Sequence, residues 1–207
     1  RLSRSWYEIC RRSGYFRRQR VMDHTVYFVR HGQTDWNAEG RLQGQTDTDL
    51  NDIGRVQAIG NGALLARLVN EPSNFDFVAS PMRRTRQTME LIRQAMGLDP
   101  HAYRTDERLV ELSFGDWEGH TFAELETVDD GCFARREQDK WGFVPPGQKA
   151  ESYQMLADRV APVIDRIDRD TICVAHGGIL RAVLQLTGTL TSTQAAALLI
   201  PQDKVLC

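Results

Sequence analysis

Two histidines in this chain stand directly after segments that read as β-strands. His31 follows a run of β-branched and aromatic residues, and His176 follows a second apolar run. A neutral imidazole is a good nucleophile and can carry a transferred phosphoryl group covalently. That group spreads negative charge over three oxygens, so its site also requires fixed cationic donors. Histidines at these positions therefore point to phosphoryl transfer, with His31 as the candidate nucleophile.

Arginines and glycine turns near the two histidines supply donors for the phosphate oxygens. Arg30 precedes the first histidine directly, and Arg83 and Arg84 follow another predicted strand. A guanidinium fork matches phosphate oxygens in pairs, which an ammonium group does not do. His176 can donate a further hydrogen bond, and Gly177 begins a predicted helix whose free N–H groups favour an anion.

A leaving alkoxide also requires a proton, and Glu111 is our first candidate for its donor. Aromatic side chains flank this stretch, and together with a bound phosphate they favour a carboxyl group that keeps its proton. The same carboxylate can later accept a proton from the water that attacks the phosphohistidine. Asp116 and Glu118 are weaker candidates from the same stretch.

Each of these signals, taken alone, has an ordinary structural explanation. A histidine at a strand end is more often a surface residue than a nucleophile. Arg83, Arg84 and Arg86 could form a solvated helix face, and the glycines after His176 could form a packing turn. We favour phosphoryl transfer because the ordinary explanations would all have to be true at the same time at three strand ends.

The elements that must position these residues alternate between strand and helix. This order predicts an α/β three-layer sandwich, with a mostly parallel central sheet covered by helices on both faces. Ligands of such sheets bind beyond the carboxyl ends of the strands, so both histidines should meet at one edge. We expect strands at 26–29, 75–79 and 171–175, and helices that Asn51, Pro81, Ser152 and Gly177 open.

Residues 115–150 interrupt this alternation. The stretch contains scattered aromatic residues and a Pro-Pro pair, without a sustained helical or strand period. We expect an irregular insertion or lid, and not a part of the core sheet. Most of its aromatic residues should form the lid's own small core.

Composition limits the class of protein. The 207 residues, 41% of them hydrophobic, suffice for one domain with a sizeable core. The sequence contains no run of about 18 apolar residues, the length that a membrane-spanning helix requires. The four cysteines are scattered without metal-ligand spacing, and predict neither a metal site nor a disulfide framework. A reducing compartment, the cytoplasm, fits this pattern best.

The charges are distributed unevenly along the chain. Residues 1–20 contain seven arginines and one acidic residue, whereas the remainder contains 19 basic and 27 acidic side chains. The acidic body argues against a broad nucleic-acid surface. The basic head could be a transit-like segment, could bind an acidic partner, or could lie outside the domain. We favour the last explanation, because the chain begins at Arg1 and Met22 stands just before the first predicted strand.

The expected organisation is therefore a basic extension at residues 1–22 and one domain at 23–207. At the other end, Val205, Leu206 and Cys207 resemble the start of a last strand. The domain could thus be truncated at its C-terminus, without the loss of any candidate catalytic residue.

Taken together, the motifs resemble the histidine phosphatase superfamily, the phosphoglycerate mutase-like family. The resemblance runs from about Val26 to Leu186, and its combination of motifs is far more specific than any single piece. The motifs are Val29-Arg30-His31-Gly32-Gln33-Thr34, Trp36-Asn37, Gly40-Arg41, Gln43-Gly44, Ser80-Pro81-Met82-Arg83-Arg84-Thr85, Leu109-Val110-Glu111, Phe114-Gly115-Asp116-Trp117-Glu118-Gly119 and Val174-Ala175-His176-Gly177-Gly178.

The resemblance implies a role for each motif residue and implies no metal or organic cofactor. His31 is the phosphorylated nucleophile, Glu111 is the proton donor, and Arg84, not Arg83, stands at the family position in the phosphate pocket. The expected catalytic residues are His31, Glu111, Arg30, Arg84 and His176, and the expected substrate-binding residues are Asn37, Gln43, Gly44 and Gly177.

We expect hydrolysis of a small phosphorylated metabolite, with neither nucleic acid nor membrane as partner. Cofactor-dependent mutase-type transfer is the alternative, because it uses the same residues and differs in how well water is excluded. The short lid and the modest length resemble the phosphatase branch. A non-catalytic phospho-ligand module ranks last, because it predicts the loss of His31, Arg84, His176 or Glu111, and all four are present. The loop at 146–152 lacks the compact Pro-Gly-Gly-Glu-Ser sequence of the family, so the sequence does not identify the substrate.

Overall fold

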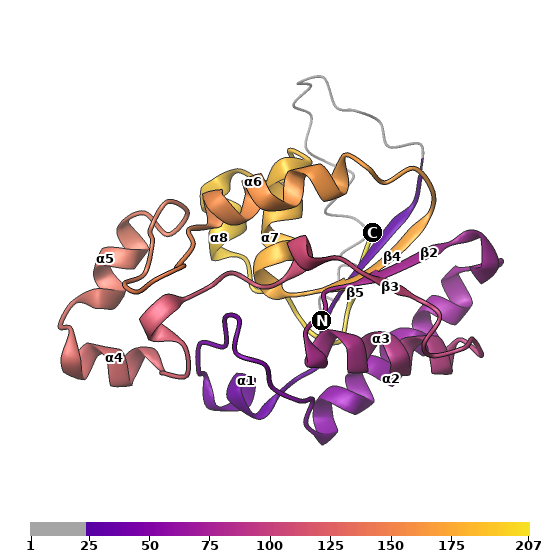
Figure 1. Cartoon of the computed structure of the whole chain (residues 1–207), viewed down its shortest axis with the longest axis horizontal. Helices are drawn as coiled ribbons and strands as arrows, with labels where there is room; N and C mark the ends of the chain where they lie inside the picture. The colour runs from indigo at the N-terminus through magenta and orange to yellow at the C-terminus, as the bar shows by residue number, and fades with distance from the viewer. Residues whose placement is uncertain (1–23) are drawn as a thin grey trace, which may run out of the picture.

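The computed structural model describes residues 24–207, so the expected basic extension lies outside the described part. A five-stranded sheet forms the centre, in the order β3-β2-β4-β1-β5 (Figure 1). The first four are parallel, and β5 pairs antiparallel with β1. The strands are β1 Val26–Arg30, β2 Asp76–Ala79, β3 Arg104–Thr105, β4 Thr171–Ala175 and β5 Val205–Leu206.

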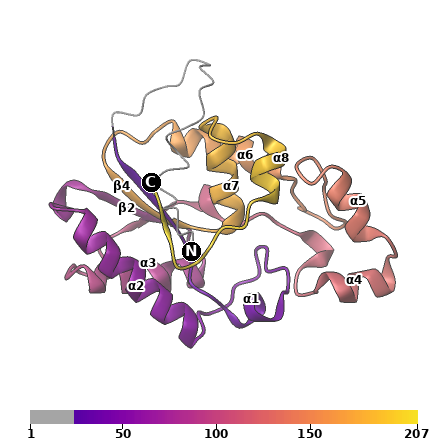
Figure 2. The same cartoon turned by 180° about the vertical axis from the view of Figure 1, so that it is seen from behind.

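Helices cover both faces of the sheet, as expected. Two pack on one face and three on the other (Figures 1 and 2). The first group is α2 Asp52–Leu68 and α3 Arg83–Ala95, and the second is α6 Tyr153–Ile164, α7 Gly177–Leu186 and α8 Ser192–Ala197. Successive strand residues point to opposite faces, so Phe77 packs with the first group and Val78 with the second.

Side chains cap two of the helices that the sequence predicted. Asn51 accepts a hydrogen bond from the amide of Gly54, and Ser152 accepts one from the amide of Met155. Each oxygen satisfies an amide that has no partner inside its helix. Both predicted helix starts are therefore confirmed.

The expected start of α3 at Pro81 is wrong. The helix begins at Arg83, with Met82 as its N-cap and without a cap from a nearby side chain. The amide of Arg83 instead donates to Oδ1 of Asp47, at 2.8 Å. A partner 36 residues away thus satisfies the helix start, and local sequence signals do not record such a partner.

Residues 115–150 lie outside the sheet, as expected, but are more regular than expected (Figure 1). They contain a 3₁₀ turn at Gly115–Trp117 and two helices, α4 Phe122–Val128 and α5 Cys132–Gln138. A reciprocal cap between Thr121 and Glu124 starts α4. Trp117 and its neighbours form a separate small core, so the predicted lid core is confirmed.

The strand register brings the carboxyl ends of three strands to one edge. Arg30 pairs with Ala175, and Ala79 pairs with Val174. The amide of His31 donates to Ala175 at 2.9 Å, just beyond the end of the strand. The residues that follow β1, β2 and β4 therefore leave the sheet together. Within residues 24–207, no helix is both long and apolar enough to cross a bilayer.

Candidate active site

A pocket of about 150 Å³ opens at this edge of the sheet. Every site residue expected from the sequence lines it, except His176. The pocket walls come from the ends of β1 and β4, the start of α3, and two loops. The expected site residues that line the pocket are Arg30, His31, Asn37, Gln43, Gly44, Arg84, Glu111 and Gly177.

His31 is buried and is held in one tautomer. Its Nδ1 atom lies 2.7 Å from the carbonyl oxygen of Gly32. A carbonyl oxygen only accepts, so Nδ1 carries the proton and Nε2 keeps its lone pair. Burial, and then the charges of Arg84 and Arg30, hold the pKa of His31 well below its usual value. The imidazole is therefore neutral at neutral pH, the form that can attack phosphorus.

Arg84 is a buried cation and Arg30 a partly buried one, and neither has a carboxylate partner within ion-pair distance among the described residues. Arg84 donates to the carbonyl oxygens of Thr46 and Gly44, at 2.9 and 2.8 Å. Arg30 donates to the carbonyl of Ile200, at 2.7 Å. Burial lowers the pKa of Arg30 to about 10 and lowers that of Arg84, so both remain charged at neutral pH. Buried charge without a counter-charge is costly, and a bound anion would compensate it.

His176 lies behind His31 and does not line the pocket. The two ring centroids are 5.2 Å apart. Nε2 of His176 lies 2.8 Å from Oγ of Ser80, and the ring is completely buried. Burial, and then Arg84, hold the pKa of His176 well below its usual value. The sequence marked Ser80 as a strand end but gave it no role.

Buried polar atoms without a hydrogen-bond partner gather around this pocket. Within residues 24–207 there are five such atoms, and four belong to the expected site residues. Three of those four are nitrogens that can donate to an anion. The four atoms are Nε of Arg30, Nε of Arg84, Nδ1 of His176 and Oε1 of Gln43.

The loop that carries Gln43 and Gly44 is held by Glu118. Glu118 accepts hydrogen bonds from the amides of Gln45 and Thr46, each at 3.0 Å, and from that of Phe114 at 3.1 Å. Its carboxylate therefore braces two loops against each other, and Glu118 does not line the pocket, which argues against it as the proton donor. Sequence reasoning missed this brace, because Gln45 and Thr46 lie 73 and 72 residues away from Glu118.

Asn37 lines the pocket through the short helix α1 Asp35–Glu39. Its Oδ1 accepts from the amide of Thr34 and from the side chain of Gln202. Its side-chain carbonyl therefore fixes the helix start and ties it to the C-terminal segment.

Glu111 reaches the first turn of α7. Its two carboxylate oxygens accept from the amide of Leu112, at 2.9 Å, and from that of Gly178, at 3.0 Å. A methyl group at Gly178 would lie 2.3 Å from Oε1 of Glu111, so only glycine allows this approach. Of the weaker candidates, Asp116 is exposed and does not line the pocket.

Arg159 holds the chain that leads into Glu111, and sequence reasoning missed it. Its guanidinium donates to the carbonyl oxygens of Arg108 and Val110, at 2.7 and 2.9 Å. The same group pairs with Glu151 at 2.8 Å, and Glu151 in turn accepts from the amide of Ser113. One partly buried ion pair thus fixes both sides of the candidate acid.

Of the two adjacent arginines, Arg84 lines the pocket and Arg83 does not. The side chain of Arg83 is more than half exposed and pairs with Asp49 at 2.6 Å. Arg84 is fully buried. Within residues 24–207, no three histidine, cysteine or acidic residues lie close enough together to hold a metal ion.

Comparisons with known proteins agree with this geometry. Residues 26–203 match the model of the histidine phosphatase superfamily, branch 1. The chain is 35% identical over 171 residues to a glucosyl-3-phosphoglycerate phosphatase of Mycolicibacterium vanbaalenii, covering 76% of this chain and 71% of the relative. It is 39% identical over 140 residues to a probable phosphoglycerate mutase of Salmonella paratyphi C, covering 65% and 59%. A solved mycobacterial glucosyl-3-phosphoglycerate phosphatase with inorganic phosphate superposes with a TM-score of 0.68 at 30% identity, covering 84% and 83%.

Proposed function

Because this chain belongs to branch 1 of the histidine phosphatase superfamily, we propose that it is a phosphomonoesterase acting through a phosphohistidine on His31. One observation carries the assignment to this residue. The neutral His31 has an unprotonated Nε2 and lies in one pocket with the guanidinium groups of Arg30 and Arg84, each of which has a buried Nε atom without a hydrogen-bond partner within residues 24–207. A phosphate monoester supplies the missing negative charge and the phosphorus atom that the imidazole attacks.

Two displacements at phosphorus make up the reaction. First, Nε2 of His31 forms a bond to phosphorus while the ester oxygen leaves with a proton from Glu111. The guanidinium groups of Arg30 and Arg84 bind the oxygens of the transferring group. Then water attacks the phosphohistidine, the N–P bond breaks, and Glu111 accepts a proton from the water. Inorganic phosphate leaves, and both side chains return to their first state.

Hydrolysis is favoured over mutase-type transfer as the net reaction. The relative named as a phosphatase matches 76% of this chain, whereas the one named as a mutase matches 65%. The expected lid contains only two short helices, α4 and α5, and neither contributes a lining residue to the pocket. A mutase must exclude water from its phosphohistidine until the second hydroxyl arrives, and a small lid suits hydrolysis better.

Small phosphorylated metabolites are the proposed substrates, and the proposed compartment is the cytoplasm. A pocket of about 150 Å³ accommodates a phosphate group and a small part of its ester. Cys132 and Cys173 are buried free thiols, which suits a reducing compartment. Neither nucleic acid nor a membrane is proposed as a partner.

Two assays on the full chain separate the candidate reactions. We expect phosphate release from p-nitrophenyl phosphate, and its loss in His31→Ala but not in His120→Ala, which removes an exposed histidine. Brief incubation with labelled substrate should trap an acid-labile, alkali-stable phosphoenzyme in the parent and in the control alone. Turnover only of 3-phosphoglycerate with a bisphosphate primer would favour the mutase. Phosphate binding without turnover would favour a binding module.

A further inference from the structure

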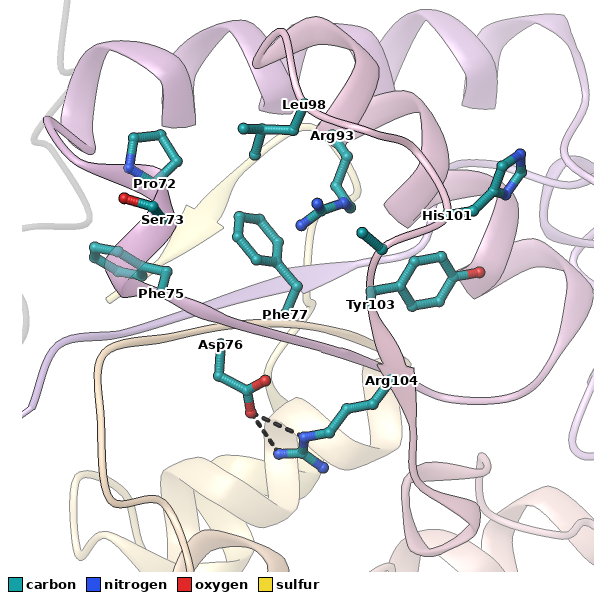
Figure 3. A pocket seen from close by; sticks show the side chains of 11 residues that line it. Pro72, Ser73, Phe75, Asp76, Phe77, Arg93, Leu98, His101, Tyr103 and Arg104 are labelled. Carbon is teal, nitrogen blue, oxygen red and sulfur yellow. Dashed lines mark hydrogen bonds and ion pairs between the residues drawn. The ribbon is translucent and has the colours of Figure 1, made fainter.

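A second pocket lies at the far end of β2 from the candidate active site. It has a volume of about 480 Å³ and is built from the turn before β2, the first residues of β2, the end of α3 and the segment 98–104 (Figure 3). None of its lining residues lines the candidate active site. The two pockets are therefore separate, although β2 and α3 contribute to both regions.

A buried guanidinium group points into this second pocket (Figure 3). Arg93 is only 6% exposed, and its Cζ atom lies 4.2 Å from the centre of the Phe77 ring. Nε donates to the carbonyl of Asp99, at 2.7 Å. Within residues 24–207, Nη1 and Nη2 make no hydrogen bond or ion pair. Four N–H donors of a buried cation are thus left for a ligand or for water.

Aromatic rings form much of the remaining wall, together with Ser73, His101 and one charged pair at the rim. Phe75, Phe77 and Tyr103 present aromatic surfaces to the pocket. Arg104 and Asp76 pair with each other at 2.7 Å, away from Arg93 (Figure 3). Because these two charges neutralise each other, Arg93 is left as the unpaired charge among the lining arginine and aspartate residues.

We propose that this pocket binds a small organic monocarboxylate with a flat apolar body. The free end of a guanidinium group matches the two oxygens of a carboxylate. The volume lies within the range of small-molecule sites, and the aromatic walls suit a ring or a planar chain. One unpaired positive charge balances one negative charge, which favours a carboxylate over a doubly charged phosphate.

Both sites can be occupied at the same time. Arg84 in the candidate active site and Arg93 in the second pocket lie nine residues apart on α3, about 14 Å along the helix axis. The carboxylate should therefore bind without displacing phosphate. This independence also allows the two proposals to fail separately.

Fluorine NMR on the full chain with 4-fluorobenzoate as the probe tests the proposal. We expect saturable binding at millimolar or lower concentrations, unchanged by saturating inorganic phosphate and retained in His31→Ala. Neutral 4-fluorobenzamide should bind about tenfold or more weakly, because it loses a charge-assisted hydrogen-bonded pair. A fluorinated phenylphosphonate should bind no better than the carboxylate.

Two variants and one control connect the binding to this pocket. Arg93→Gln removes the charge, and Ala102→Trp fills the pocket from an exposed lining residue while leaving Arg93 in place. Both should abolish binding, and the second remains informative if the first fails to fold. Arg67→Gln removes an exposed arginine from the last turn of α2 and should bind as the parent does.

Several results would overturn the proposal. They are the absence of probe binding by the parent chain, unchanged binding in folded Arg93→Gln or Ala102→Trp, and displacement by inorganic phosphate. Equal binding of the benzamide would remove the role assigned to the charge. Tighter binding of the phosphonate would show that the pocket prefers a phosphonate or phosphate group to a carboxylate. Each result is independent of whether His31 becomes phosphorylated.

Discussion

The hydroxyl oxygen of Ser80 lies 2.8 Å from Nε2 of His176, which joins the residues after β2 and β4 inside the core. Because burial favours a neutral His176, one ring nitrogen donates and the other accepts. If the Ser80 hydroxyl donates to Nε2, the proton of His176 stays on Nδ1. That nitrogen has no partner within residues 24–207, and we predict that Ser80 keeps it able to donate to a phosphate bound beside His31.

Replacement of Ser80 should therefore weaken phosphate binding. In Ser80→Ala, Nε2 loses its buried partner and the tautomer is no longer fixed, at a cost of about 1–3 kcal/mol. We expect about a tenfold rise in KM for p-nitrophenyl phosphate and in the inhibition constant of inorganic phosphate. Ser80→Thr keeps the hydroxyl and should restore both constants. Unchanged constants in a folded Ser80→Ala would show that Ser80 only packs.

Glu111→Gln tests the proposed proton donor through the leaving group. An alkyl phosphate requires protonation of its leaving oxygen, so we expect a loss in kcat/KM of about 10²-fold or more. The loss should be smaller with p-nitrophenyl phosphate, whose leaving group scarcely requires a proton. Asp116→Asn, an exposed carboxylate from the same stretch, is the matched control. An equal loss with both substrates would remove Glu111 from the acid role.

Arg159 should act through Glu111 and not on the substrate. Arg159→Met frees the carbonyl oxygens of Arg108 and Val110 and leaves Glu151 without its ion pair. We expect destabilisation of about 1–3 kcal/mol, together with the leaving-group dependence of Glu111→Gln. Arg166→Met, an exposed arginine after α6, should change neither property. A purely structural role would lower the rates with both esters equally.

Stability should fall with pH below about 6.5 because two histidines are buried in neutral form. The pKa values of His31 and His176 are held well below the usual value, whereas the unfolded chain takes up these protons near pH 6.5. Their contribution is therefore complete above that pH and is lost as the pH falls below it. Each histidine adds a slope of about 1.4 kcal/mol per pH unit.

Urea denaturation between about pH 7 and about pH 5 measures this slope. His31→Gln removes one of the two groups, so its stability should depend less steeply on pH by about 1.4 kcal/mol per unit. His101→Gln removes an exposed histidine and should keep the parent's slope. Equal slopes in the parent and in His31→Gln would mean that His31 is protonated in the folded chain.

The sequence predicted the parts of the fold that depend on local patterns. The strand at 171–175 was placed correctly, because its five residues are buried on both faces and form an unbroken apolar run. The caps by Asn51 and Ser152 follow a local rule. The convergence of His31 and His176 followed from the expectation of a parallel sheet, in which the carboxyl ends of the strands share one edge. Arg84 was separated from Arg83 through the family motif.

What the sequence did not predict depends on contacts between distant residues. The start of α3 depends on Asp47, the tautomer of His176 on Ser80, and the approach to Glu111 on Arg159. None of these pairs has a characteristic spacing, so no periodic or capping signal records it. The sequence did not predict the second pocket for the same reason, because its walls come from four separate segments.

Gly44 gives the sharpest test of the loop that supports Arg84. Its φ of +51° favours glycine, and an added methyl group would lie 2.1 Å from Oε1 of Glu118. Gly40 has a similar φ of +73°, but an added methyl group there would meet no atom within 4 Å, which makes Gly40→Ala a matched control. Both variants should lose about 1 kcal/mol of stability from backbone strain.

Only Gly44→Ala should also weaken phosphate binding. The new methyl group must displace Glu118, which braces this loop, and the carbonyl oxygens of Gly44 and Thr46 accept from Arg84. Arg84 would then lose the two bonds that aim its guanidinium at the pocket. We expect about a tenfold or greater fall in kcat/KM for Gly44→Ala, and rates close to the parent's for Gly40→Ala. Equal rates in both variants would mean that Arg84 keeps its position without this loop.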